Sequence, residues 1–208
     1  KRQGLLIFLP ALYFFYFEFS NVPLMERVWV SLFQSVTPRT AGFNTADLTL
    51  LSEVGQMLII ILMLIGGSPG STAGGMKTTT LAVLVSSALS VFRKKEHTHF
   101  FGRRIPDDTI KNAATIFLMY IVLFLVGGMV ISSTEDIPLM TALFETASAI
   151  GTVGLSLGIT PDLGLVSHII LICLMFLGRV GGLTLIFATL SEKKLNGSKY
   201  PQEKITVG

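Results

Sequence analysis

Long apolar runs separated by short polar stretches make up most of this chain. Three of the runs, at residues 4–19, 109–132 and 163–190, are predicted to be membrane spans. Two more, at 54–65 and 79–91, are each shorter than the ~20 residues that a spanning helix needs. Together with the glycine-rich segment between them they are long enough, so the pattern predicts one span that is broken in its middle.

Each half of the chain also carries a half-length apolar segment, Leu24 to Val36 in the first half and Pro138 to Ala149 in the second. Each segment is followed by a string with the pattern Thr-x-Gly-apolar, and a shift of 112 positions aligns the string at 40–43 with the string at 152–155. Both halves therefore read span, short segment, string, span. We predict an internal repeat in which each short segment is a re-entrant pore helix.

The sequence thus predicts an all-α fold, a polytopic membrane protein of two span–pore-loop–span repeats with one broken span. The expected division of the chain is a first repeat with the broken second span at 1–95, a cytoplasmic linker at 96–108, a second repeat at 109–194 and a cytoplasmic tail at 195–208.

Composition and charge agree with this class. Half of the residues are hydrophobic and only 14% are charged, which is too apolar for an ordinary soluble domain. Basic residues flank the apolar runs at 1–2, 93–95, 103–104 and 193–194, so these ends of the spans are expected in the cytoplasm. The formal net charge of +3 is small, and we expect no nucleic-acid partner.

The two strings have the chemistry of a cation filter. Backbone carbonyls can replace the hydration shell of a monovalent cation, and glycine lets successive carbonyls turn toward one axis because it has no β-carbon. A pore helix would add the negative end of its dipole. No acidic residue lies in either string, which favours potassium or sodium over a divalent ion. The predicted filter residues, which would bind potassium through their carbonyls, are Thr40, Ala41, Gly42, Phe43, Thr152, Val153, Gly154 and Leu155.

Two questions about this filter have more than one answer from the residues alone. A ring of carbonyls takes four strings and this chain has two, so either two copies pair or the other half of the pore lies elsewhere. The chain begins with basic residues directly before an apolar run, which we interpret as a fragment boundary. Glu145, on the second predicted pore helix, either supports the filter by hydrogen bonding or faces the outer vestibule.

The glycine-rich segment inside the broken span is the second candidate site. A break at membrane depth leaves backbone groups that lipid cannot satisfy, so it is tolerated only where protein or a water-filled path meets it. We interpret the segment as a gate across the conduction path. The alternatives are a flexible hinge and a phosphate-binding loop, although such a loop needs glycine directly before its lysine and here Met76 intervenes. The predicted gate residues are Gly66, Gly67, Ser68, Pro69, Gly70, Ser71, Thr72, Ala73, Gly74 and Gly75.

Arg179 lies inside the last predicted span, at the position that matches Gly67 in the repeat. A charge inside a membrane helix costs ~2.5–3.5 kcal/mol on insertion scales, so we expect Arg179 to face the bundle interior and to have partners. We add Arg179 to the predicted gate, with the hypothesis that it donates hydrogen bonds to carbonyls of the glycine-rich segment. The alternative is that its side chain reaches water at the cytoplasmic interface.

Two motifs resemble a known family. Residues 37–44 read Thr-Pro-Arg-Thr-Ala-Gly-Phe-Asn, and residues 66–75 read Gly-Gly-Ser-Pro-Gly-Ser-Thr-Ala-Gly-Gly. They resemble the superfamily of potassium transporters that comprises Trk, Ktr and HKT, and within it most closely the bacterial KtrB membrane subunits. The resemblance covers the whole chain, including the tail at 205–208.

The resemblance implies a pore of four repeats in the bacterial cell membrane, with this chain as the third and fourth repeats. It also implies potassium translocation through the filter, gated by the glycine-rich loop, which Arg179 would contact. Potassium would be the substrate, sodium commonly stimulates uptake in this family, and no other cofactor is expected. The implied partners are membrane lipid, the N-terminal half of the same transporter, a second copy in a homodimer, and a cytosolic ring of nucleotide-binding KtrA-like subunits.

An enzyme is not expected, because the sequence contains no recognisable nucleophile–base pair and no cluster with metal-ligand spacing. The alternative function is a secondary transporter with its substrate site at the broken helix, since discontinuous helices are common to both classes. A carrier does not need half-length pore helices. A purely structural membrane module would leave the two strings unexplained.

Overall fold

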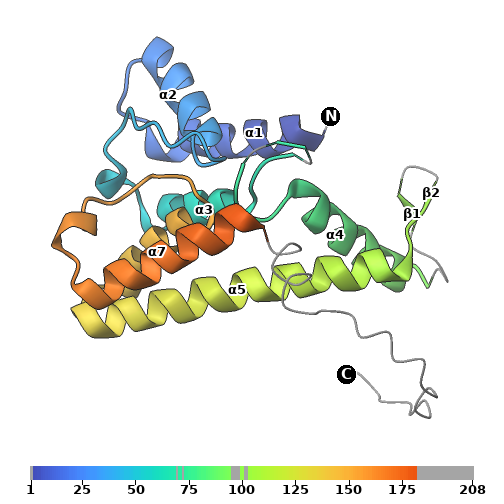
Figure 1. Ribbon diagram of the computed structural model, residues 1–208. Helices are drawn as coiled ribbons and strands as arrows, with labels where there is room; N and C mark the ends of the chain where they lie inside the picture. The colour runs from blue at the N-terminus through green and yellow to red at the C-terminus, as the bar shows by residue number, and fades with distance from the viewer. Residues whose placement is uncertain (1, 69, 72, 95–98, 101–102, 182–208) are drawn as a thin grey trace.

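The structure is a computed structural model that describes residues 2–68, 70–71, 73–94, 99–100 and 103–181. Helices make up most of the described chain (Figure 1). In chain order the elements are α1 (Arg2–Tyr13), the π-helix η1 (Phe14–Glu18), α2 (Leu24–Val36), the 3-10 helix η2 (Leu48–Leu50), α3 (Glu53–Leu64), α4 (Thr78–Phe92), β1 (His99–Phe100), β2 (Arg103–Arg104), α5 (Asp107–Glu135), α6 (Leu139–Ile150), the 3-10 helix η3 (Thr160–Asp162) and α7 (Leu165–Val180).

The predicted all-α class is confirmed. The strands of the described chain form a single antiparallel hairpin of two residues each, with His99 opposite Arg104, in the segment between α4 and α5. Helix α2 coincides with the first predicted short segment, and α6 lies within one residue of the second. Local apolar patterning was therefore sufficient to locate these helices.

The predicted break in the second span is present. The chain leaves the helical conformation between the end of α3 and the start of α4, which are 12 and 15 residues long. At 1.5 Å per residue neither crosses the ~30 Å apolar layer of a bilayer. Among the described helices, α5 alone, with 29 residues, is long and apolar enough to cross by itself. The predicted last span continues past the end of α7, to residues that lie outside the described part of the chain.

Helix α6 lies at the centre of the fold. It packs against α5, α7 and α3, and α7 runs alongside α5, while α1 and α2 pack together on the other side of α3 (Figure 1). Every residue from Phe144 to Ile150 is buried, although this stretch includes polar side chains. On the facing helix α3, Ile59 and Met63 are fully buried and belong to the same core. The two halves of the chain are therefore joined through α3 and α6.

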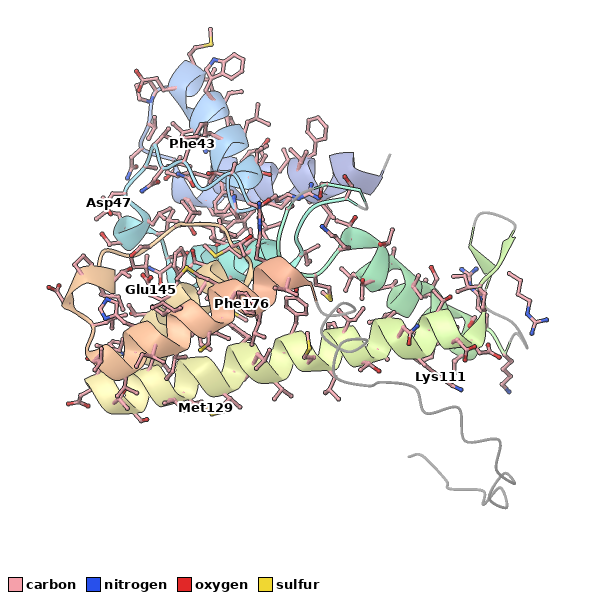
Figure 2. The ribbon with its side chains drawn as sticks, in the orientation of Figure 1. Phe43, Asp47, Lys111, Met129, Glu145 and Phe176 are labelled. Carbon is pink, nitrogen blue, oxygen red and sulfur yellow. The ribbon has the colours of Figure 1, made fainter. Side chains whose placement is uncertain are left out.

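The outward faces of the long helices are apolar. On α5, Leu118 is 63% exposed and Met129 53%, and on α7, Phe176 is 64% exposed (Figure 2). Apolar surface of this extent is the surface expected of a protein whose solvent is lipid.

A carboxylate joins the first helix of each half to the start of a later helix. At the end of η1, Glu18 accepts a hydrogen bond from the N–H of Ser52 (3.0 Å) and others from the hydroxyls of Ser52 and Tyr13. At the end of α5, Glu135 accepts from the N–H of Gly164 (2.8 Å) and from the hydroxyl of Ser167. Ser52 and Gly164 are the N-cap residues of α3 and α7. Each carboxylate thus satisfies a helix N-terminus and interacts favourably with its dipole.

We expect Glu18→Ala to lower the free energy of unfolding by ~1–3 kcal/mol, because Ser52 would lose a charged acceptor. The measurement is thermal unfolding of the purified protein in detergent. Glu53→Ala is the matched control, since Glu53 lies one residue further along the same helix start and is exposed. Equal stability of the two variants would contradict a capping role for Glu18.

Candidate functional site

The two predicted filter strings share an unusual backbone conformation. Thr40 and Thr152 have φ values of +68° and +51°, and Gly42 and Gly154 have +73° and +90°. Positive φ is rare for threonine, which shows that the chain holds these positions in a left-handed conformation despite its cost. The two residues stand at matching places of the repeat, so the same turn is built twice.

The structure brings the two strings together. A β-carbon built on Gly42 would lie 2.1 Å from the carbonyl oxygen of Val153 and 3.8 Å from the Cα of Gly154. The backbones of the two strings therefore touch at the glycine of the first, where any side chain would collide with the second. Sequence patterning predicted each string, and this contact between them comes from the tertiary structure.

Each string follows the carboxyl end of a half-length helix and is tied back to that helix. After α2, the hydroxyl of Thr37 donates to the carbonyl of Phe43. After α6, the hydroxyl of Ser148 accepts from the N–H of Gly154 (3.2 Å). Both helices end at the strings, so their negative dipole ends lie where a cation would be stabilised.

A second tie from each helix reaches the residue two places beyond the string's glycine. Gln34 on α2 is fully buried and its amide nitrogen lies 3.5 Å from the amide oxygen of Asn44. Glu145 on α6 is 4% exposed and accepts a hydrogen bond from the hydroxyl of Ser156 (2.7 Å) (Figure 2). Of the two alternatives for Glu145, hydrogen bonding behind the string is the one that the structure supports.

Asp47 lies in the segment that leads from the first string to α3 (Figure 2). Its carboxylate accepts hydrogen bonds from the hydroxyl (2.6 Å) and the N–H (2.9 Å) of Thr49. These two bonds, the hydroxyl first, hold the pKa of Asp47 below its usual value. Asp47 therefore keeps its negative charge near the exit of the first string at neutral pH.

The glycine-rich segment between α3 and α4 folds back on itself. The N–H of Gly66 donates to the carbonyl of Met76 (2.8 Å), and the N–H of Thr78 donates to the carbonyl of Gly67 (3.2 Å). These bonds close the base of a loop and satisfy backbone groups that the broken helix has left without partners. Pro69 and Thr72, two of the predicted gate residues, lie outside the described residues.

The side chain of Lys77 is hydrogen-bonded to the backbone of the loop. Its ammonium group donates to the carbonyls of Ser71 (3.0 Å) and Ala73 (2.6 Å). Lys77 is not among the gate residues predicted from the sequence. The available signal was its charge: a lysine next to a helix break at membrane depth must find oxygen acceptors, and the nearest acceptors are the carbonyls that the break leaves free.

The loop packs directly against the second string. A β-carbon on Gly74 would lie 2.0 Å from the hydroxyl oxygen of Thr152, and one on Gly75 would lie 3.4 Å from the Cα of Gly151. The hydroxyl of Thr152 is buried and has no hydrogen-bond partner among the described residues. The second string and the loop are therefore in contact, without a layer of other side chains between them.

Arg179 faces the same region. A cavity of about 410 Å³ is lined by Thr40 and Thr152 of the strings, by Ser71 and Ala73 of the loop, and by Arg179. Arg179 also borders a second cavity of about 410 Å³ on the Lys77 side of the loop. Two cations, Lys77 and Arg179, thus lie beside the loop and line one cavity together. Within the described chain, no group of three or more acidic, histidine or cysteine side chains is arranged to hold a metal ion.

The fold and this site define an all-α membrane protein in which two half-length helices each lead into a glycine-containing string and a loop packs against one of the strings. Comparisons with known proteins agree. Residues 6–198 match the family described as TrkH, cation transport protein. A solved structure of the potassium transporter TrkH from Vibrio parahaemolyticus has the same fold, with a TM-score of 0.74 over 91% of this chain and 42% of that one at 23% identity.

Among curated proteins, the chain is 43% identical to the potassium/sodium uptake protein NtpJ of Enterococcus hirae over 189 residues, which are 88% of this chain and 42% of that protein. It is 35% identical to Ktr system potassium uptake protein B of Bacillus subtilis over 200 residues, which are 93% of this chain and 45% of that protein. The chain therefore spans less than half the length of these relatives. It belongs to the TrkH family of cation transport proteins, which are proteins of the cell membrane and not enzymes.

Proposed function

We propose that this chain forms half of a potassium-translocating pore that crosses the cell membrane. The observation that carries the proposal is the contact between Gly42 and the carbonyl of Val153, since it joins two glycine-containing strings of the same unusual conformation. Carbonyl oxygens in such strings would replace the water around a dehydrated cation. Relatives named as potassium or potassium/sodium uptake proteins support this choice of ion.

The filter of this proposal consists of the strings at 40–43 and 152–155. The chain would cross the membrane several times as two span–pore–span repeats, at 1–95 and 109–194, joined by a cytoplasmic linker at 96–108 and followed by a cytoplasmic tail at 195–208. The two capping carboxylates, Glu18 and Glu135, support this division. Each lies at the end of the first helical segment of its repeat and accepts a hydrogen bond from the N-cap residue of the last helix in that repeat's described part or of its broken span.

The gate of this proposal is the loop from Gly66 to Gly75. Its contact with Thr152 supports a position directly below the second string, where it would obstruct an ion that leaves the filter. Lys77 would hold the loop in its folded form, and Arg179, which lines a cavity beside the same loop, would assist it. Opening would require the loop to leave these two cations.

The missing half of the pore and its partners follow from the same proposal. The chain matches 42% and 45% of two relatives, so an N-terminal half with two more strings would complete the ring. We propose a homodimer of the complete protein in the membrane, regulated by a cytosolic ring of nucleotide-binding subunits. Sodium would act as a stimulating ion.

The experiment is ion flux through the complete transporter in lipid vesicles, with potassium or sodium as the only cation. A pore gives rapid passive flux that follows the potassium gradient and is smaller for sodium. Slow, saturable flux that alternates between the two sides would favour a secondary transporter and contradict the pore. Soaking crystals in rubidium is an independent measurement, in which ion density should lie against the carbonyls of 40–43 and 152–155.

We expect Arg179→Ala to raise potassium flux through the unstimulated transporter about tenfold, because removing this cation from beside the loop shifts the loop toward its open form. Flux into vesicles without the regulatory ring is the measurement. Lys111→Ala is the control, because Lys111 is an exposed cation near the start of α5, on the part of that helix that extends away from α7 (Figure 2). Unchanged flux in Arg179→Ala would remove this residue from the gate.

A further inference from the structure

A buried carboxyl group, that of Glu145, is hydrogen-bonded to the segment that leaves the second string. Glu145 lies on α6 with only 4% of its surface exposed, so a carboxylate there requires full compensation by hydrogen-bond donors. It has three. Its Oε1 accepts from the hydroxyl of Ser156 (2.7 Å) and the N–H of Leu157 (2.9 Å), and its Oε2 accepts from the hydroxyl of Thr160 (2.8 Å).

These donors all lie in the segment that leaves the second string. Ser156 follows Leu155 directly, and its oxygen also accepts from the N–H of Gly158 (2.9 Å) and lies 2.9 Å from the hydroxyl of Thr160. The buried side chain of Glu145 therefore fixes the position of residues 156–160, the limb that leaves the second string. Because that limb continues the string, its position decides where the carbonyls of Val153 and Gly154 come to rest.

The corresponding place in the first half is occupied by Gln34, since the half-length helices align with a shift of 111 positions, one fewer than the strings, and the hydrogen bonding there is weaker. Its amide nitrogen makes a single contact of 3.5 Å with Asn44, and its amide oxygen is buried without a partner among the described residues. Asn44 corresponds to Ser156 by the 112-residue shift. The two strings thus have the same kind of support, with three good hydrogen bonds on one side and one long contact on the other.

We propose that Glu145 is a positioning residue for ion selectivity, which holds the second string at the spacing that favours potassium over sodium. The inference rests on the proposed filter. It further states that the second string is the more rigid of the two and contributes more to discrimination. Glu145 acts through hydrogen bonds to Ser156, Leu157 and Thr160, and it does not itself contact the ion.

Two substitutions of Glu145, by glutamine and by alanine, distinguish a role in hydrogen bonding from an effect of charge. In Glu145→Gln, the amide oxygen would still accept from Ser156 and Leu157, and the amide nitrogen would donate to the oxygen of Thr160. The hydroxyl of Thr160 would then be free to donate to Ser156, which is already 2.9 Å away. The glutamine variant therefore keeps every tie and removes only the charge, whereas the alanine variant removes both.

The experiment is the potassium-to-sodium permeability ratio of the complete transporter in lipid vesicles. We expect Glu145→Ala to lower the ratio about tenfold, Glu145→Gln to stay within about twofold of the wild-type ratio, and Gln34→Ala to have a smaller effect than Glu145→Ala. An equal loss in Glu145→Gln and Glu145→Ala would overturn positioning in favour of charge. A wild-type ratio in Glu145→Ala would overturn the inference altogether.

Two further variants keep the test decisive. If Glu145→Ala does not fold, Thr160→Val removes one donor with little change of shape, and it should lower the ratio; an unchanged ratio would again overturn the inference. A wrong assignment of the filter as a whole would give a different result from a wrong assignment of Glu145. In that case substitutions of Gly42 would also leave the ratio unchanged, whereas a wrong assignment of Glu145 alone leaves them effective.

Discussion

Gly42→Ala should abolish most of the discrimination between potassium and sodium, with the permeability ratio falling at least about tenfold. The added β-carbon would lie 2.1 Å from the carbonyl oxygen of Val153, and the backbone on both sides of this contact has to move because neither atom belongs to a flexible side chain. The φ of +73° adds strain of roughly 1–2 kcal/mol for any residue with a β-carbon. The measurement is the reversal potential, or the flux ratio, in vesicles with both cations.

Two other glycines provide matched controls for this variant. Gly154 and Gly158 have φ values of +90° and +92°, and a β-carbon at either would meet no described atom within 4 Å. Gly154→Ala therefore introduces strain inside a string without a collision, and Gly158→Ala introduces the same strain beyond it. We expect the loss of selectivity to decrease in the order Gly42, Gly154, Gly158. Selective transport by the Gly42→Ala protein would argue that the two strings do not form the filter.

Gly74→Ala should produce a leaky gate, with resting potassium flux raised about tenfold. Its β-carbon would lie 2.0 Å from the hydroxyl oxygen of Thr152 and 2.9 Å from the β-carbon of the same residue. Rotation of the threonine side chain cannot relieve the second contact, so the loop has to withdraw from the string. Overpacking of this kind typically costs 1–3 kcal/mol, which is enough to shift a closed loop toward open forms. Flux without stimulation by sodium or the regulatory ring is the measurement.

Gly70→Ala is the control for the gate, because Gly70 belongs to the same loop and a β-carbon there adds strain at a φ of +85° but meets no described atom within 4 Å. Rescue provides a stricter test. The double variant Gly74→Ala with Thr152→Gly removes the colliding side chain, and glycine suits the φ of +51° at position 152. We expect its resting flux to return toward that of Thr152→Gly alone. Additive effects of the two changes would mean that loop and string are not coupled through this contact.

Several properties of this protein were determined by the sequence alone. Helix positions followed from the length and spacing of apolar runs, because the preference of a segment for a helix in lipid depends mainly on its own residues. Helix α2 has the predicted bounds, and the second span is broken where the glycine-rich segment lies. The Thr-x-Gly strings were recognisable because the same residues recur after each half-length segment at a shift of 112 positions.

Other properties were decided by the tertiary structure. The sequence left two roles open for Glu145, and the three donors that resolve the choice lie 11 to 15 residues further along the chain. The acceptors of Lys77 exist only because the loop folds back over its side chain. Glu18 reaches Ser52 across 34 residues. A buried polar group must find partners somewhere, so its presence predicts that a contact exists, but the identity of the partner depends on how distant segments pack.

The same distinction applies to the proposed pore. The residue types that permit each string are local, because glycine accepts the positive φ found at positions 42 and 154. The contact between Gly42 and Val153, and the contact between Gly74 and Thr152, join segments that are far apart in the sequence. Those contacts arise where α3 packs against α6, since that interface brings the two halves of the chain into one core. Patterning along the chain therefore determined what each element is, and packing between the halves decided which elements meet.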